Sequence, residues 1–460
     1  MESKPDDTAQ HENMGELLGR GHDVVVSELD KSGNVKRRWL HTKDNCVLPI
    51  VENRRNDFLS RSLREWRKTL ADAFLPVGFP HSVSADYLAY QTYDSLQAFF
   101  STITSLLANR ALLQGLGVGD ANSSATHALL LTILKDAMSR IATIVFAHRF
   151  GLRIEPDAKR YRFLADLFND TAFFLELLSP ALGSWGKVAA LSLGEALRAL
   201  CGVAAGASKA ALSVHFAKHD NLAELNAKEA SQETAVGLVG LLVGTIVVKH
   251  VEDPRSVVAL TVLLVLAHLG MNYLAVRSVC MTSLNRQRAT ILFEQYLTSG
   301  RMLTPTEVAA HESIIFWRPV INDESGEASA SLHLSEDYAR CFGKGVQADT
   351  QIIDTPTYVL FVCPQSGGLL TANGFLRTNA QPIDAIKAWH HLMLIAKRWT
   401  KGSPGPDKRS IAFEKSPEFD SVLRSSLERS GWDLDTQAFE TGVPVRLDIS
   451  KGGAGGAKIY

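Results

Sequence analysis

The sequence predicts a mainly helical, membrane-associated bundle followed by a small C-terminal α+β domain. Residues 257–276 (VVALTVLLVLAHLGMNYLAV) contain no charge and are flanked by Arg255 and Arg277. At about 1.5 Å per helical residue, this run is long enough to cross the hydrocarbon core of a bilayer. A second charge-free run, TAVGLVGLLVGTIVV, covers residues 234–248. Together the two runs predict a helical hairpin that turns at residues 252–254.

Small residues mark one face of the second run. Gly237, Gly240 and Gly244 are three or four residues apart and therefore share a helix face. Glycines at this spacing let two helices approach closely in lipid, so we expect close helix packing along this face. The alternative is a buried helix pair in a large soluble domain, because the run is short for a complete membrane span.

The apolar middle of the chain divides into further helices of similar length. The predicted helices cover roughly residues 91–113, 122–149, 158–181, 186–216, 230–250 and 256–280. Turn residues separate them, such as Pro156 and Asp157 before the third helix and Pro180 near its end. Because the two triplets have similar lengths and order, a three-plus-three repeat is a further hypothesis, with coincidence as its alternative.

The segments on either side have the composition of aqueous protein. We therefore expect three parts: a polar segment with a β-hairpin at 1–59, the helical domain at 60–300, and an α+β domain with a flexible tail at 301–460. Alternation around a glycine-containing turn predicts the hairpin at residues 24–41. The other expected elements are an amphipathic helix at 60–73, strands at 357–363 and 443–449, and helices at 382–399 and 419–430.

Charged side chains inside the second and third predicted helices form the candidate binding site. They are Lys135, Asp136, Arg140, Asp166 and Asp170. An ionisable group within a span costs at least about 2.5–3.5 kcal/mol, so it usually pairs or lines a polar path. Asp136 and Arg140 are four residues apart and share a helix face. Asp166 and Asp170 share a face in the same way, so Lys135 and Arg140 can meet these two aspartates across a helix pair. The alternative is a set of solvated charges on a soluble or membrane-surface bundle.

Composition excludes several classes of function. The chain has 48 basic and 49 acidic residues and a net charge of -1, which argues against a nucleic-acid partner. Its five cysteines lack C-x-x-C spacing, so neither a zinc site nor a disulfide framework is predicted. The amino terminus lacks the apolar core of a secretory signal. We therefore expect a membrane protein that contacts membrane lipid and is not secreted.

No recognised catalytic motif is present. GLGVG at 115–119 follows a helix and lacks the strand that precedes a dinucleotide-binding loop. GGAGGAK at 452–458 lacks the hydroxyl residue and the helix of a phosphate-binding loop. His390 and His391 are adjacent on a predicted helix and point to different faces, so they predict no metal site. We expect neither enzymatic activity nor a cofactor, and no Schiff-base lysine for a pyridoxal-phosphate enzyme can be identified.

Several long segments resemble one family. They are FLPVGFPHSVSADYLAYQTYDSLQAF (74–99), ILKDAMSRIATIVFAHRFG (133–151), DAKRYRFLADLFNDTAFFLELLSP (157–180) and NLAELNAKEASQETAVGLVGLLVG (221–244). This text, over about residues 60–300, resembles the RUS (root UV-B sensitive) family, whose shared region is described as a vitamin B6 photoprotection and homoeostasis domain. The resemblance implies a membrane protein with a role in vitamin B6 homeostasis and, in plants, in UV-B responses. It supplies no catalytic residue, and Met138, Ser139 and Ala142 stand where the family is usually rich in glycine.

Two functions remain as hypotheses. In the first, the protein is a membrane carrier or adaptor for a small polar metabolite linked to vitamin B6, and the charged group on the second and third helices lines its path. In the alternative, it is a non-catalytic assembly protein that binds another RUS-family protein, or itself, through the face of Gly237, Gly240 and Gly244.

Overall fold

The structure is a computed structural model of the chain. It describes residues 23–29, 35–42, 46–50, 66–67, 69–115, 125–323, 325–334, 337–342, 345–347, 349–365, 368–401 and 422–449. The glycine-containing turn of the predicted hairpin, most of the GLGVG loop, the GGAGGAK tail and the start of the helix predicted at 60–73 lie outside these residues.

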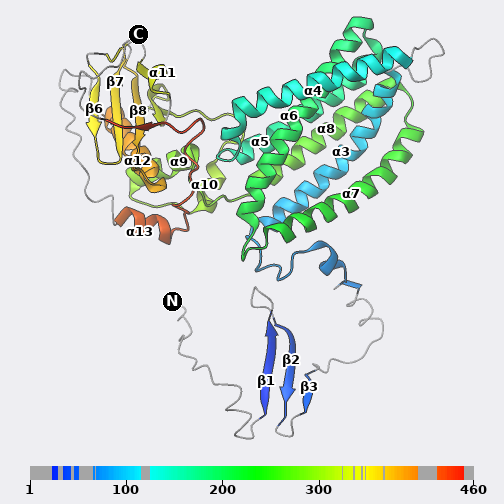
Figure 1. Ribbon diagram of the computed structural model, residues 1–460, viewed down its shortest axis with the longest axis horizontal. Coiled ribbons are helices and arrows are strands. Elements are labelled where there is room, and N and C mark those ends of the chain that lie inside the picture. Colours follow the sequence, from blue (N-terminus) through cyan, green and yellow to red (C-terminus); the bar gives the residue numbers. More distant parts are fainter. Residues whose placement is uncertain are drawn as a thin grey trace, which may run out of the picture. The chain divides into compact units, whose positions relative to one another are not determined.

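The chain forms two compact units, Met1–Tyr87 with Phe216–Ala235, and Leu88–His215 with Val236–Tyr460. The first unit contains the antiparallel strands β1 (Val24–Leu29), β2 (Val35–His41) and β3 (Val47–Pro49) (Figure 1). The hairpin predicted at residues 24–41 is confirmed, because β1 pairs with β2. Residues 69–74 are helical, as predicted for the described part of that segment.

Hydrogen bonds hold the connector that follows this helix. Within the first unit, the backbone N–H of Val77 donates to Glu224 Oε1 at 2.7 Å, and Asn221 Nδ2 donates to Ser82 O at 2.9 Å. The ring of Tyr87 packs edge-on against Phe216 with 5.6 Å between centroids. The connector therefore has defined partners although proline and glycine prevent it from continuing the helix.

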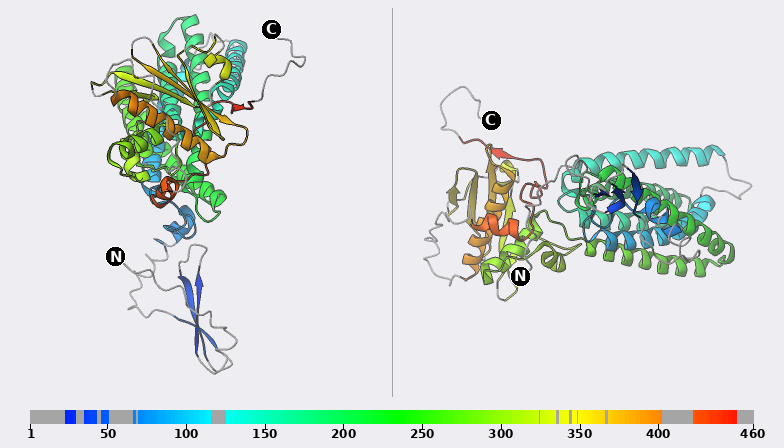
Figure 2. Two further views of the ribbon diagram at one scale, coloured as in Figure 1. Left: turned by 90° about the vertical axis from the view of Figure 1, so that its left-hand side faces the viewer. Right: turned by 90° about the horizontal axis from the view of Figure 1, so that it is seen from below.

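Long helices form the larger part of the second unit, and Figure 1 and the right-hand view of Figure 2 show them side by side. They are α3 (Tyr87–Gly115), α4 (Ala125–Ile154), α5 (Ala158–Leu178), α6 (Ser184–Phe216), α7 (Leu222–His250) and α8 (Pro254–Ser278), of which α3 and α7 begin in the first unit. The predicted order of helices is confirmed. Helix α7 starts earlier than predicted because the residues before position 230, LAELNAKE, consist largely of residues with high helix propensity.

The predicted hairpin of charge-free helices is present as α7 and α8. Pro254 occupies the first turn of α8, where its missing N–H costs no hydrogen bond. The Asp253 carboxylate caps the helix by accepting from the backbone N–H of Ser256 at 2.9 Å. Among the described residues, α6, α7 and α8 are long and apolar enough to cross a membrane.

Apolar side chains cover much of the outer surface of these helices. On α7, Leu238, Leu242 and Ile246 are each about 60% exposed, and on α8 Leu263 and Leu266 are exposed to a similar degree. A soluble protein rarely exposes contiguous apolar patches of this kind, whereas a membrane-embedded helix requires them.

The glycine face of α7 packs against α3 of the same chain. A Cβ atom on Gly240 would lie 2.9 Å from Thr102 Cβ and 3.3 Å from the Phe99 carbonyl oxygen. A Cβ on Gly244 would lie 2.5 Å from Leu106 Cδ1, whereas one on Gly237 would find only Thr102 Oγ1, at 4.0 Å. The predicted close packing is therefore present at Gly240 and Gly244, and the helix that approaches them, α3, belongs to the same chain.

The C-terminal part of the second unit combines a mixed sheet with helices. Its strands are β4 (Val320–Asn322), β5 (Ala328–Leu334), β6 (Gln351–Asp354), β7 (Tyr358–Pro364), β8 (Leu370–Arg377) and β9 (Arg446–Leu447). Its helices are α9 (Arg286–Ser299), α10 (Pro305–His311), α11 (Tyr338–Phe342), α12 (Pro382–Lys401) and α13 (Val422–Arg429). The strand order is β4-β5-β8-β7-β6, with β9 beside β8. The predicted α+β composition is confirmed, and the strand predicted at 443–449 is reduced to β9.

The sheet has a hydrophobic core on each face. Figure 1 and the left-hand view of Figure 2 show α12 across one face, where Leu360 and Val362 of β7 pack in the same core as the buried Trp389 of α12. The alternate residues of β7, Val359 and Phe361, pack on the other face with Phe375. This alternation is the two-residue period of a strand covered on both sides.

Replacement of the packed glycine should destabilise the helical bundle. We expect Gly240→Ala to lower the free energy of unfolding by about 1–3 kcal/mol, because its methyl group would overpack Thr102 and the α3 backbone. Gly237→Ala is the matched control and should change stability little. Thermal unfolding of both purified variants in detergent checks this, and equal melting temperatures would contradict the α3–α7 contact.

The C-terminal part should lose stability in mild acid. Burial, together with the neighbouring His391, lowers the pKa of His390 to about 4, and burial with Arg398 lowers the pKa of His391 to about 4. Unfolded histidines take up protons near pH 6.5, so the unfolded state gains protons first and stability falls as the pH drops from about 6.5 to about 4.

The measurement is the melting temperature of the full chain between pH 7 and pH 4. We expect a shallower decline for the double variant His390→Phe, His391→Gln than for the unaltered protein. His311→Gln, at an exposed position, is the control. Superimposable pH profiles for the double variant and the unaltered protein would show that the two histidines do not cause the decline.

Candidate functional site

Helices α3, α5 and α8 enclose a network of buried polar side chains. Arg162 on α5 forms ion pairs with Asp94 of α3 at 2.7 Å and with Asp166 of its own helix at 2.9 Å. Both aspartates are almost completely buried. Since Arg162 and Asp166 are four residues apart, they share the face of α5 that also meets α3.

One carboxylate oxygen is the centre of this network. Asp166 Oδ2 accepts hydrogen bonds from Arg162 Nη1, from the amide of Gln97 on α3 and from the amide of Asn272 on α8. Asn272 Nδ2 also donates to the carbonyl oxygen of Arg162 at 3.3 Å. Three helices are thus joined through a single acceptor.

A second carboxylate lies one turn further along α5. Asp170 Oδ2 is 2.8 Å from His268 Nδ1 on α8, and both residues are at most 2% exposed. Within the described part of the chain, Asp170 Oδ1, Gln97 Oε1 and Asn272 Oδ1 are buried acceptors that have no hydrogen-bond partner. Buried polar atoms are rarely left without one, so the network has unused capacity to accept hydrogen bonds.

The structure separates the five charged residues that the sequence predicted to form one site. Asp166 and Asp170 are in the buried network, but the expectation that Lys135 and Arg140 meet them is wrong. Lys135 instead pairs with Glu195 of α6 at 3.2 Å, and Asp136 and Arg140 are exposed. The reason is rotation: α4 directs Lys135 toward α6, whereas the aspartates of α5 face α3 and α8.

Several members of the network were missed. They are Asp94, Gln97, Arg162, His268 and Asn272. For α8 the signal was available, because His268 and Asn272 are polar residues four apart within an otherwise apolar run and therefore share a face. Arg162 lies in the basic first turns of α5, yet its side chain is turned inward and is mostly buried.

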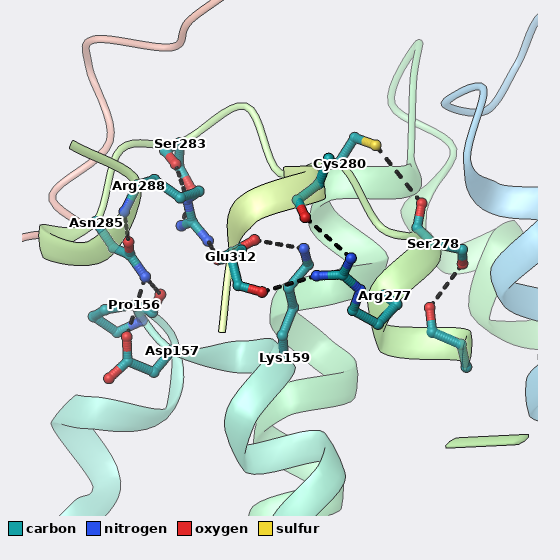
Figure 3. Close-up of polar contacts among 12 residues, drawn as sticks. Pro156, Asp157, Lys159, Arg277, Ser278, Cys280, Ser283, Asn285, Arg288 and Glu312 are labelled. Carbon is teal, nitrogen blue, oxygen red and sulfur yellow. Dashed lines mark hydrogen bonds and ion pairs between the residues drawn. The ribbon is translucent and has the colours of Figure 1, made fainter. Parts of the chain in front are cut away.

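A separate buried cluster joins the start of α5 to the C-terminal part of the unit (Figure 3). The Glu312 carboxylate lies between Lys159 Nζ at 2.6 Å and Arg288 Nη1 at 3.0 Å. Burial opposes the charged form of Glu312, but the two cations outweigh this effect and hold the pKa of Glu312 below its usual range. Asn285 donates from Nδ2 to the Pro156 carbonyl at 2.9 Å and to Asp157 Oδ1 at 3.1 Å.

This cluster anchors helices and offers no metal site. Arg277 at the end of α8 donates to the carbonyl oxygens of Glu312 and Ala310, so α8 is fixed to the same segment as α5. Among the residues that the structure describes, no group of three or more histidine, cysteine, aspartate or glutamate side chains could hold a metal ion.

Comparison with known proteins identifies relatives over most of the chain. RUS family member 1 of Dictyostelium discoideum is 40% identical over 251 residues, which cover 54% of this chain and 48% of that protein. Protein root UVB sensitive 6 of Arabidopsis thaliana is 30% identical over 388 residues, or 84% of this chain and 73% of that protein. Protein root UVB sensitive 3 of Arabidopsis thaliana is 29% identical over 386 residues, or 80% of this chain and 84% of that protein.

The family described as the vitamin B6 photo-protection and homoeostasis domain matches residues 60–300. This range contains all of α3 to α8 and therefore the whole buried network. No solved structure is similar at a significant level. The matched range covers more than half of the chain, and this protein belongs to the RUS (root UVB sensitive) family.

Proposed function

We propose that the protein is a membrane carrier for a small polar metabolite and acts in vitamin B6 homeostasis, the role named in the description of its family. One observation carries the proposal. The bundle encloses the ion pairs of Arg162 with Asp94 and Asp166, and the buried contact between Asp170 and His268 lies one turn further along α5. A charge inside a membrane bundle marks a substrate or ion pathway by default.

The energetic cost of the network supports a functional role. Replacing a buried ion pair by well-packed apolar residues is often neutral or stabilising, so stability alone does not explain why Arg162 is kept among apolar helices. The buried acceptor atoms of Asp170, Gln97 and Asn272 offer hydrogen bonds to the hydroxyl or ammonium group of a passing metabolite.

The location that we propose is a membrane, with α6, α7 and α8 as spanning helices. Their length and apolar composition support this location. One relative, 26% identical over 432 residues, is named "Protein root UVB sensitive 2, chloroplastic".

Transport should depend on the buried carboxylate of α5. We expect Asp170→Asn to reduce uptake of radiolabelled pyridoxine into proteoliposomes at least tenfold, because the variant loses the carboxylate that contacts His268. Asp136→Asn is the matched control, since Asp136 lies exposed on α4. Resistance of the reconstituted protein to carbonate extraction verifies insertion. Equal uptake with both variants and with protein-free vesicles, under verified insertion, would refute the carrier.

A second candidate function, assembly with another RUS-family protein or a second copy, is supported by the outer stripe of α7. The predicted glycine face is occupied by α3, so a partner would have to use the side formed by Leu238, Leu242 and Ile246. These residues are four apart and follow one face of the helix.

Cysteine cross-linking tests this second candidate. In membranes from expressing cells, we expect Leu242→Cys to form a covalent dimer with a short bifunctional thiol reagent. Leu266→Cys, exposed to a similar extent on α8, is the control and should stay monomeric. If Leu242→Cys stays monomeric, the α7 stripe is not the interface. If Leu266→Cys forms the dimer equally well, the cross-linking is not specific to the α7 stripe, which again excludes it as the interface.

A further inference from the structure

A cavity of about 590 Å³ lies on the side of α5 opposite the buried network. Asp157, which precedes α5, and Tyr161, Leu164 and Phe168 of α5 line it. At about 100° per residue these positions share one face, whereas Arg162, Asp166 and Asp170 lie on the other. Residues of α4, α6 and α9 and of the C-terminal part complete the wall.

We propose that this cavity binds a small planar aromatic anion, such as a ring that carries a phosphate ester. Aromatic side chains and guanidinium groups together line the space, and its volume is within the range of about 300–1,000 Å³ that is usual for small-molecule sites. The proposal goes beyond the carrier function and does not depend on it, because none of the residues of the polar network lines the cavity.

Positive charge predominates among the lining residues. Arg153, Arg160 and Arg286 contribute three guanidinium groups, and Asp157 is the one carboxylate among the cavity residues. Asp157 accepts a hydrogen bond from Asn285, and burial raises the pKa of its carboxyl group despite the nearby arginines. The net field of the cavity therefore attracts an anion.

Two of the arginines are held in place before any ligand binds. Arg286 donates from Nε to the carbonyl of Phe439 at 2.9 Å and from Nη2 to that of Leu334 at 2.6 Å. Arg153 donates from Nε to the carbonyl of Thr441 at 3.2 Å. A guanidinium has five N–H donors, so Arg153 can make this bond and also bind a phosphate or carboxylate.

Aromatic rings form the apolar part of the wall. The ring of Phe146 lies 5.0 Å from that of Phe150 and meets Tyr161 and Phe168 edge-on at 6.5 Å and 6.1 Å. Trp317 lines the same cavity. Rings in offset or edge-to-face arrangements favour an aromatic guest over an aliphatic one of equal size.

The first turn of α5 also favours an anion in the cavity. Asp157 precedes this helix, but its side chain makes no capping hydrogen bond to the first turn. The N–H groups of this turn are therefore not capped by Asp157, and both Asp157 and Arg160, at this positive end of the helix dipole, line the cavity.

Binding of a matched pair of ligands to the full-length protein in detergent tests the proposal. The probes are pyridoxine 5′-phosphate and pyridoxine, which share a ring but differ in charge and lack the aldehyde that would react with lysines. Inorganic phosphate and phenyl phosphate separate the contribution of the ring from that of the charge. We expect calorimetry to give at least tenfold tighter binding of both ring phosphates than of pyridoxine or inorganic phosphate.

Substitutions localise the site. We expect Arg153→Gln and Arg160→Gln each to weaken binding of pyridoxine 5′-phosphate at least tenfold, and Arg149→Gln, on the exposed surface of α4, to change it less than twofold. Unchanged melting temperatures exclude unfolding as the cause. Equal binding of pyridoxine and its phosphate, equal binding of inorganic phosphate, or equal losses in all three variants would overturn the proposal. Loss of binding with intact pyridoxine uptake would leave the carrier function standing.

Discussion

The buried ion pairs of Glu312 are the interaction on which the arrangement of the second unit depends. Glu312 holds Lys159 at the start of α5 and Arg288 in α9, so the helical bundle and the C-terminal part meet at one carboxylate. Removing one partner of such a pair would leave a buried charge without compensation, which typically costs about 3–5 kcal/mol. Arg277 adds the end of α8 to the same junction through two carbonyl oxygens.

Because its start is fixed in this way, α5 can present different chemistry on its two sides. One face directs Asp166 and Asp170 toward α3 and α8, where Asp166 accepts from an arginine and two amides and Asp170 contacts a histidine. The other face, with Tyr161 and Phe168, forms part of a cavity lined by arginines and aromatic rings. The helix therefore separates a region rich in acceptors from a region rich in cationic donors.

The distribution of polarity agrees with a membrane-embedded bundle. Leucine and isoleucine side chains are exposed on the outside of α7 and α8, whereas the charges of the network between α3, α5 and α8 are enclosed. Close approach of α3 and α7 at Gly240 requires no polar contact, since the absence of a side chain is sufficient. The C-terminal part has the opposite pattern, with apolar residues such as Trp389 in its core.

The sequence by itself determined the helices, the β-hairpin, the α+β composition and the family, because periodicity, turn residues and motif order are local properties of the chain. It also identified Asp166, Asp170, Gly240 and Gly244 as positions with special requirements. Only the tertiary structure decided their partners, since a partner depends on how each helix is rotated about its axis and which neighbour packs beside it. For this reason Lys135 meets Glu195 rather than an aspartate of α5, and the glycine face meets α3.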